Sequence, residues 1–198
     1  EKTAGKPYNS AAYIELGGTA VVRGVYQKFF LPTYRVFDER RFVDEGQSLG
    51  MFETRLGKIG VLICEDAWHS VMGTLLARHG ATTICTLIAS PARGFQGEEP
   101  SNVERYERMT RAMAEEHGVY SISCMLTGFE GGKGLVGGSV IYAPNGQQLA
   151  RGGTLDDHMI VATVDEEIQR SARDGAPLIS DLNNRWDALM KLDQGEDS

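Results

Sequence analysis

Three short apolar segments alternate with two segments of helical character in the middle of the chain, and this alternation constrains the fold more than any other feature. The apolar segments, residues 58–63, 82–88 and 119–125, are short runs of branched and other apolar residues of the kind that form buried strands. Strands that alternate with helices favour a mixed α/β fold in which the strands are buried between helices.

The two intervening segments carry helix signals. Residues 66–79 have apolar residues at helical spacing, and Gly80 follows as a stop signal. The second helix is predicted to start at a capping box formed by Ser101 and Glu104 and to end at Gly118. Its predicted apolar stripe consists of Val103, Tyr106, Met109 and Met113.

A hairpin is predicted on the N-terminal side of this unit. Strands at 10–16 and 19–26 are separated by Gly17-Gly18, a pair that suits the tight turns of hairpins. A long ordered loop is predicted at 27–46, and a further strand at 50–54.

The C-terminal side is also predicted to contain a hairpin, with strands at 137–142 and 147–150 around the turn sequence "PNG". Another strand is predicted at 158–165. A short helix and an extended tail are predicted to follow it.

The composition is that of a soluble globular protein, with 41% hydrophobic and 24% charged residues. The 198 residues suit a single domain, predicted at 1–193 and followed by a disordered tail at 194–198. The net charge of −7 argues against a nucleic-acid or membrane partner, because phosphate binding needs clustered Lys and Arg. No apolar segment is long enough to span a bilayer and no signal-peptide pattern opens the chain, so we expect a cytoplasmic protein.

The three cysteines, Cys64, Cys85 and Cys124, are odd in number and widely spaced, which is not the pattern of a disulfide framework. No Cys or His pair has the spacing of a zinc finger. We therefore expect no structural metal.

Cys64 stands directly after a predicted strand and in front of a predicted helix, in the segment "VLICEDAW". A buried cysteine is a common core residue. The position also suits a nucleophile, because backbone N–H groups and the helix dipole at a helix start favour a thiolate. Glu65 and Asp66 are expected to favour the helix dipole rather than to act as the base. None of the histidines supports a Cys–His pair.

Five segments resemble those of the nitrilase (carbon–nitrogen hydrolase) superfamily. "GVLICEDAW" resembles its nucleophile segment, and "YQKFFLPTYRVFDERRFVDEG" resembles its lysine segment. The other three, in the family's order, are "PYNSAAYIELGG", "IASPARG" and "VGGSVIYAPNGQQLARG". The resemblance covers nearly all of residues 6–182 and is greatest to the glutamine-amidase domains of NAD synthetases and their stand-alone relatives.

The resemblance implies a role for each matched residue. Cys64 would be the nucleophile, Lys28 the lysine that stabilises the oxyanion, and Glu39 a second glutamate that orients the lysine and the substrate. The backbone N–H of Glu65 would be another oxyanion donor. Without the family resemblance, Lys28 and Glu39 would be interpreted as ordinary surface residues. Arg40 could be a structural partner of Glu39.

For several further residues, a role in the pocket and a purely structural role are both open. Ser90, Pro91 and Arg93 could line the pocket, although a Ser-Pro turn has structural reasons of its own. Trp68, Tyr34 and Phe129 could form either pocket wall or core.

The sequence departs from the family in one respect. The family's catalytic base is a glutamate well before the "YNSAA"-like strand, and Glu1 is too close to that strand to fill this role. The expected fold is therefore a nitrilase-like α-β-β-α sandwich that lacks its first strand–helix portion. Either the chain is a C-terminal piece, or it is a genuine short protein without the base.

The resemblance implies hydrolysis of a C–N bond in a small amide, for example the side chain of glutamine, through a cysteine thioester. N-carbamoyl amino acid hydrolysis or nitrilase activity would use the same residues. A catalytically silent binding or scaffold protein is a third alternative, because the triad glutamate is absent. No cofactor is required, and a homo-oligomer is expected from the resemblance alone.

Overall fold

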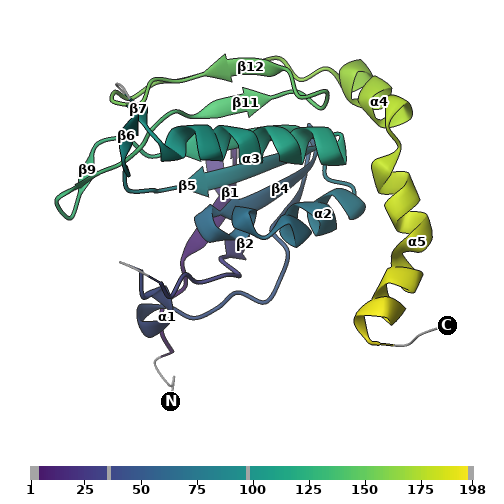
Figure 1. The fold of residues 1–198 in the computed structure, drawn as a ribbon, viewed down its shortest axis with the longest axis horizontal. Coiled ribbons are helices and arrows are strands. Elements are labelled where there is room, and N and C mark those ends of the chain that lie inside the picture. Colours follow the sequence, from purple (N-terminus) through teal and green to yellow (C-terminus); the bar gives the residue numbers. More distant parts are fainter. Residues whose placement is uncertain (1–4, 35–36, 97–98, 196–198) are drawn as a thin grey trace.

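The computed structural model describes residues 5–34, 37–96 and 99–195, and its centre is a six-stranded mixed sheet (Figure 1). The strand order is β12-β11-β8-β5-β4-β3. These strands are β3 (Met51–Thr54), β4 (Gly57–Ile63), β5 (Thr83–Ile88), β8 (Tyr120–Met125), β11 (Val140–Tyr142) and β12 (Gln148–Arg151). The predicted mixed α/β class is confirmed.

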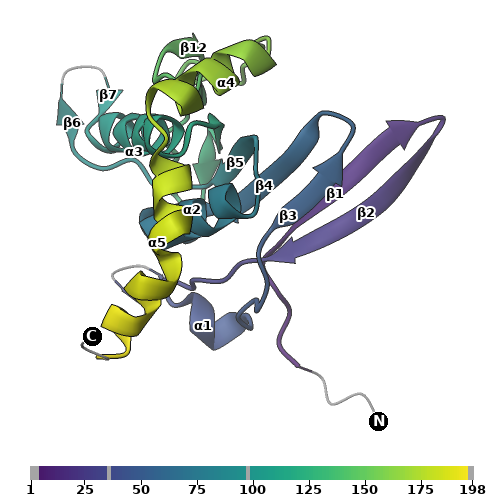
Figure 2. The same ribbon diagram turned by 90° about the vertical axis from the view of Figure 1, so that its right-hand side faces the viewer.

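The three central strands β4, β5 and β8 are parallel, and the outer strands pair antiparallel to their neighbours. The connections between the parallel strands contain α2 (Ser70–Arg78) and α3 (Asn102–His117). Both helices lie on the same side of the sheet (Figures 1 and 2). The carboxyl ends of the three parallel strands therefore meet at one edge of the sheet.

The main core lies between this helical layer and the sheet. Leu62 of β4 and Ile84 of β5 are fully buried, and they pack with Leu76 of α2 and Met113 of α3. Complete burial of one such side chain stabilises the fold by about 1.5–3 kcal/mol. A second cluster continues the core toward the carboxyl ends of the strands, where Cys64 and Trp68 pack against it.

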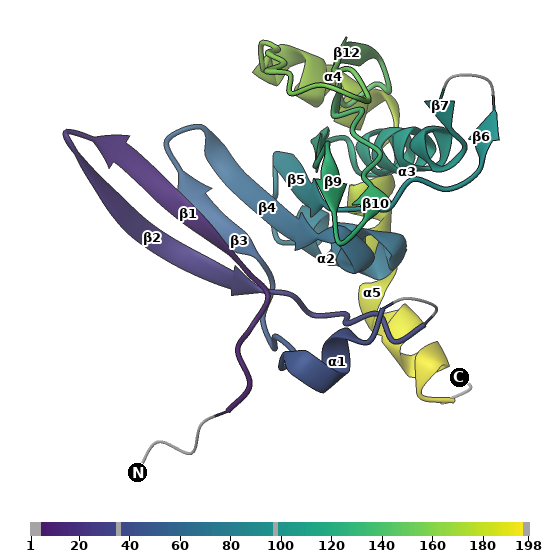
Figure 3. The ribbon, with the colours of Figure 1, turned by 90° about the vertical axis from the view of Figure 1, so that its left-hand side faces the viewer.

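A two-stranded hairpin of β1 (Ser10–Gly17) and β2 (Thr19–Gln27) projects on the side of the sheet away from α2 and α3 (Figures 2 and 3). Its turn is at Gly18, whose φ of 75° is a conformation that favours glycine. The base of the hairpin packs on β4 through Ala11, Tyr26 and Ile63. The predicted N-terminal hairpin is thus confirmed.

The C-terminal region forms two helices, α4 (Glu166–Gly175) and α5 (Leu178–Asp193). Gln169 Nε2 donates hydrogen bonds to the carbonyl oxygens of Thr82 and Gly118, and the Arg173 guanidinium donates to those of Gly118 and Ala81. These contacts fasten α4 to the amino ends of β5 and β8.

Several short elements complete the described chain. The helix α1 covers Glu39–Phe42, and a 3-10 helix, η1, covers Cys64–Trp68. Four two-residue strands form two small ladders: β6 (Phe95–Gln96) with β7 (Glu99–Pro100), and β9 (Phe129–Glu130) with β10 (Lys133–Gly134).

The structure corrects three predicted elements near the C-terminus and in the loop at 27–46. Residues 158–165 form no strand, because no described strand pairs with them; Met159 is 91% exposed. The predicted extended tail is the helix α5. The loop at 27–46 contains α1. The tail predicted to be disordered begins at Gln194, but residues 196–198 lie outside the described residues.

One predicted helix and one predicted helix cap also differ from the structure. The helix predicted at 66–79 is split, because His69 has an extended backbone between η1 and α2. The second helix, α3, starts after Ser101 and ends at Gly118 as predicted, but Ser101 has helical φ and ψ and its side chain forms no capping box with Glu104. Its hydroxyl instead donates to the carbonyl oxygen of Arg93.

None of the helices in the described residues has the length and apolar content needed to cross a bilayer. Within the same residues, no group of three or more His, Cys, Asp or Glu side chains is arranged to hold a metal ion.

Candidate active site

The candidate site lies at the edge of the sheet where the three parallel strands end. Cys64 follows β4, Ser90 lies two residues after β5, and Leu126 follows β8. All three residues line one groove with a volume of about 1250 Å³. The carboxyl ends of parallel strands are the usual place for a ligand site in an open α/β sheet.

Cys64 has a strained backbone at this edge. Its φ of 49° is the one positive value among the described residues other than glycine. A left-handed conformation costs a residue with a side chain about 1–2 kcal/mol. The sharp turn from β4 into η1 imposes this conformation and places Cys64 on the groove.

Lys28 reaches the same groove from the end of β2. Its side chain is 1% exposed, and its ammonium donates hydrogen bonds to both carboxylate oxygens of Glu39, at 2.8 and 2.7 Å. The backbone on either side of this lysine is fixed, because Lys28 N–H donates to Asn9 and the Lys28 carbonyl accepts from Gly46. Glu39 is the first residue of α1, and 27% of its side chain is exposed.

Burial raises the pKa of the Cys64 thiol above its usual value. The nearby Lys28 ammonium and a backbone hydrogen bond from Ala89 oppose this rise, whereas the carboxylates of Glu39 and Glu65 add to it. The thiol is therefore held mainly neutral, so that nucleophilic chemistry at this sulfur needs a base.

The two acids that follow Cys64 have different surroundings. Glu65 lines the groove, and its carboxylate accepts a hydrogen bond of 2.7 Å from the Tyr34 hydroxyl. Asp66 is fully buried and accepts hydrogen bonds from four donors. Asp66 lies in the first turn of η1, as expected, and its carboxylate accepts from the N–H of the N-cap residue Ile63. Its other three donors lie outside this helix, so its contacts extend beyond the helix start.

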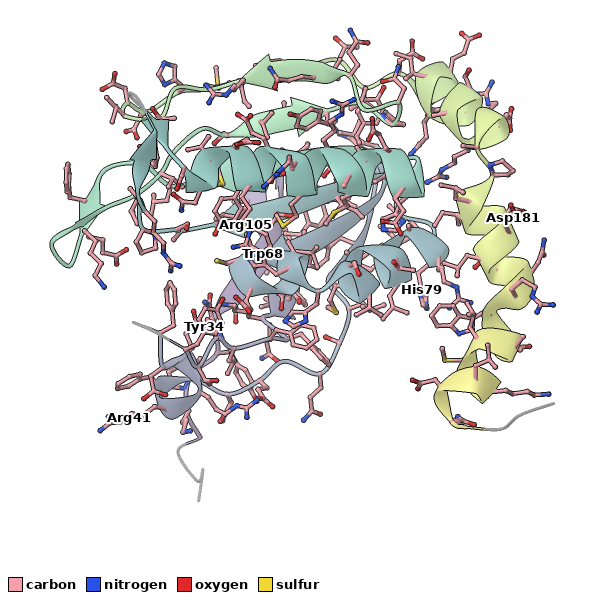
Figure 4. The ribbon with its side chains drawn as sticks, in the orientation of Figure 1. Tyr34, Arg41, Trp68, His79, Arg105 and Asp181 are labelled. Carbon is pink, nitrogen blue, oxygen red and sulfur yellow. The ribbon has the colours of Figure 1, made fainter. Side chains whose placement is uncertain are left out.

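One wall of the groove is a stack of aromatic and cationic side chains. The Arg105 guanidinium lies over the Trp68 ring, 4.3 Å from its centre, and Trp68 also packs against Tyr106. Figure 4 shows Trp68 and Arg105 next to each other, with Tyr34 on the α1 side of them. Trp68 therefore belongs to both the groove wall and the core.

The loop after β5 forms another wall and is held by Asn102, the first residue of α3. The Asn102 side-chain amide donates to the Ser90 hydroxyl and to the Pro91 carbonyl, and its oxygen accepts from the Arg93 N–H. These bonds bring Ser90 and Arg93 to the groove.

The structure brings seven of the predicted site residues together on this groove: Lys28, Glu39, Cys64, Glu65, Trp68, Ser90 and Arg93. Tyr34 also lines it. Pro91 does not line it, and neither does Phe129, which is 87% exposed. Sequence reasoning missed Asn102 and Arg105, because they lie in the first turn of a helix whose local pattern signals only helix formation.

A family model described as carbon–nitrogen hydrolase matches residues 1–173. The chain belongs to this family. A glutamine-dependent NAD(+) synthetase of Thermotoga maritima is 32% identical over 84% of this chain and 27% of the synthetase. An N-carbamoylputrescine amidase of Solanum lycopersicum is 28% identical over 94% of this chain and 64% of the amidase.

The fold has solved counterparts in the carbon–nitrogen hydrolase family. A crystal structure of a carbon–nitrogen hydrolase from Helicobacter pylori G27 superimposes with a TM-score of 0.77 at 24% identity. The match covers 92% of this chain and 66% of that structure. The chain thus spans 27% of the synthetase, 64% of the plant amidase and 66% of the bacterial structure.

Proposed function

We propose that the groove is an amidase site that hydrolyses the C–N bond of a small amide through a thioester on Cys64. The observation that carries this proposal is the buried Lys28 ammonium, which is bound by Glu39 and lies within electrostatic reach of Cys64. Burial of an ammonium is unfavourable unless it is paired. A preorganised cation beside a nucleophile is what a developing oxyanion requires.

In the proposed first half-reaction, Cys64 Sγ forms a bond to the carbonyl carbon of the amide. Lys28 Nζ and the backbone N–H of Glu65 donate hydrogen bonds to the oxyanion. The tetrahedral intermediate then collapses, the C–N bond breaks, and the nitrogen leaves as ammonia after it gains a proton. In the second half-reaction, water attacks the thioester carbon, the acid is released, and the thiol is restored.

The proton of the thiol needs a carrier in both half-reactions. The family resemblance assigns this role to a glutamate N-terminal to the segments of this sequence. Glu39 is a carboxylate at the same lysine, and its two hydrogen bonds to Lys28 suit it to orient the ammonium.

The proposed substrate is the side-chain amide of glutamine. The groove is lined by two guanidinium groups, those of Arg93 and Arg105, and neither pairs with any carboxylate among the side chains that the structure describes. Glu65 supplies a negative charge on the same groove. An amide that carries both a carboxylate and an ammonium complements these charges. The glutamine dependence of the similar synthetase supports this choice.

Hydrolysis of an N-carbamoyl amine is the second candidate. It is favoured by the similarity to N-carbamoylputrescine amidase, and it would use the same nucleophile and lysine. An N-carbamoyl amine carries no carboxylate, so it would leave Arg93 and Arg105 unpaired. The two candidates therefore differ in their dependence on these arginines.

Ammonia release from L-glutamine and from N-carbamoylputrescine tests both candidates, with Cys64→Ser as the inactive variant and Cys85→Ser as the control. We expect release from glutamine that Cys64→Ser abolishes and Cys85→Ser leaves intact. Mass spectrometry after iodoacetamide treatment should find Cys64 labelled faster than Cys85 and Cys124 near neutral pH. Equal labelling would overturn the role of Cys64. Binding of an amide without ammonia release would support a catalytically silent protein instead.

A further inference from the structure

The Asp66 carboxylate is fully buried, and the ion pairs of the described residues do not include it. Buried carboxylates are normally paired with a cation. Here four hydrogen-bond donors surround the anion. They are the Tyr26 hydroxyl at 2.8 Å, Phe30 N–H at 2.8 Å, Ile63 N–H at 3.0 Å and Phe29 N–H at 3.2 Å.

These donors flank the two residues of the proposed reaction. Tyr26 lies two residues before Lys28, and Phe29 and Phe30 follow it directly, whereas Ile63 directly precedes Cys64. One carboxylate oxygen, Oδ1, binds Phe29 and Phe30, and the other, Oδ2, binds Tyr26 and Ile63. A single side chain thus joins the backbone around Lys28 to the backbone before Cys64.

No strand ladder of the described residues makes this connection. Lys28 follows β2, which pairs with β1 in a separate two-stranded sheet, whereas Cys64 follows β4 of the six-stranded sheet. Among the described residues, the hairpin base and β4 are otherwise held by the apolar packing of Ala11, Tyr26 and Ile63. Apolar packing is not directional, so it fixes relative position less sharply than four hydrogen bonds do.

We infer that Asp66 is a positioning residue that fixes the Lys28 ammonium relative to the Cys64 sulfur. This inference rests on the proposed roles of Lys28 and Cys64. In Asp66→Asn, the remaining oxygen can serve either the Phe29 and Phe30 amides or the Ile63 amide, and the new NH₂ group faces a donor on the other side. The substitution therefore cuts the link between the two segments while it preserves the shape of the side chain.

The direction in which Asp66→Asn changes the pKa of Cys64 distinguishes a positioning role of Asp66 from a direct effect of its charge. Loss of a negative charge near a thiol would lower the pKa of Cys64 and speed its alkylation at neutral pH. Loss of the Lys28 ammonium from its place would raise that pKa and slow alkylation. The other charged groups near this sulfur, Glu39 and Glu65, are unchanged in the variant.

The test is the pH profile of Cys64 alkylation by iodoacetamide in wild type, Asp66→Asn, Lys28→Met and the double variant. We expect Asp66→Asn alone to move the alkylation profile to higher pH than in wild type. In the double variant, Asp66→Asn should add no shift to that of Lys28→Met alone. Turnover of the amide should fall on the order of 100-fold in kcat with little change in KM, because a misplaced catalytic group affects the transition state.

Two further variants keep the inference testable if Asp66→Asn folds poorly. Tyr26→Phe retains the carboxylate and its three amide donors, and it should give a smaller shift of the same sign. Asp165→Ala removes the side-chain cap of α4 at the opposite edge of the strands, and it should lower stability without moving the alkylation profile.

An unchanged or lowered profile in folded Asp66→Asn, or an equal shift in the Lys28→Met background, would overturn the positioning role. The proposed function fails separately, if wild type releases no ammonia, because the alkylation cycle needs no substrate.

Discussion

The Lys28 ammonium donates to both carboxylate oxygens of Glu39, at 2.8 and 2.7 Å, and the two partners are buried very unequally. The lysine side chain is 1% exposed, whereas 27% of the glutamate side chain is exposed. Water can therefore solvate Glu39 in part if its partner is lost, but it cannot solvate Lys28. The two halves of this ion pair are thus expected to respond differently to substitution.

Glu39→Gln should destabilise the protein more than Lys28→Met. The first change leaves a buried ammonium without its counter-charge, at an expected cost of about 1–3 kcal/mol. The second replaces the ammonium by an apolar group of similar length and should cost about 1 kcal/mol or less. Urea unfolding measures both, and both variants should lose amidase activity.

Glu45→Gln is the matched control, because it breaks the exposed ion pair with Arg40. Exposed pairs contribute about 0–1 kcal/mol, so this change should be small. A larger loss of stability in Lys28→Met than in Glu39→Gln would contradict the proposed asymmetry.

Because Cys64 has a positive φ, we expect glycine and alanine at this position to show the reverse of their usual order of stability. Cys64→Gly should be more stable than Cys64→Ala by about 0.5–1 kcal/mol, because glycine adopts this conformation without strain. The same pair at Cys85, in the middle of β5, should show the normal order, with alanine more stable than glycine. The normal order at Cys64, with alanine more stable than glycine by as much as at Cys85, would mean that the turn relaxes and stores no strain.

The sequence predicted those parts of the site that depend on the order of strands and helices along the chain. Cys64 closes a β-branched run, and the strands that precede and follow it are parallel, so its place at the ligand edge of the sheet could be predicted from the pattern. The link between Lys28 and Glu39, eleven residues apart, required the family resemblance. A loop conformation that brings two charged residues together leaves no periodic signal in the sequence.

The contacts of Asp66 could not be predicted in the same way. Its position after a strand resembles a helix start, where acids are common. Its four donors come from residues 26–30 and from Ile63, and only the packing of the hairpin base on β4 brings them together. The strand predicted at 158–165 was wrong because a local apolar pattern is not sufficient. Such a pattern forms a strand only where a neighbouring strand pairs with it.

The helix α4 offers a pair of arginines with different surroundings, and they should differ in their effect on stability. The Arg173 guanidinium donates to the carbonyl oxygens of Gly118 and Ala81, whereas Arg170 is exposed. Arg173→Met should cost about 1.5–3 kcal/mol, because it removes charge-assisted hydrogen bonds to backbone. Arg170→Met should stay within about 0.5 kcal/mol of wild type.

Thermal unfolding measures this difference, and kcat should be unchanged in both variants, because α4 binds the edge of the sheet opposite Cys64. Equal effects of the two substitutions would show that the hydrogen bonds of Arg173 do not hold α4 in place.

Arg105 should determine how well the site binds an amide that carries a carboxylate. Its guanidinium lies 4.3 Å from the centre of the Trp68 ring on the groove wall, and no described carboxylate pairs with it. Arg105→Met keeps an apolar chain over the ring but removes the charge. A lost charge-assisted hydrogen bond of about 1.5–3 kcal/mol corresponds to a rise in KM of roughly 10- to 150-fold for glutamine.

The same variant should leave the KM for a small neutral amide, such as propionamide, nearly unchanged, because that substrate has no carboxylate. Arg108→Met is the matched control, since Arg108 lies three residues further along α3, pairs with Glu104 and does not line the groove. Steady-state ammonia release with both amides measures these effects. An equal rise in KM for glutamine and propionamide would mean that Arg105 holds Trp68 in place and does not recognise the substrate carboxylate.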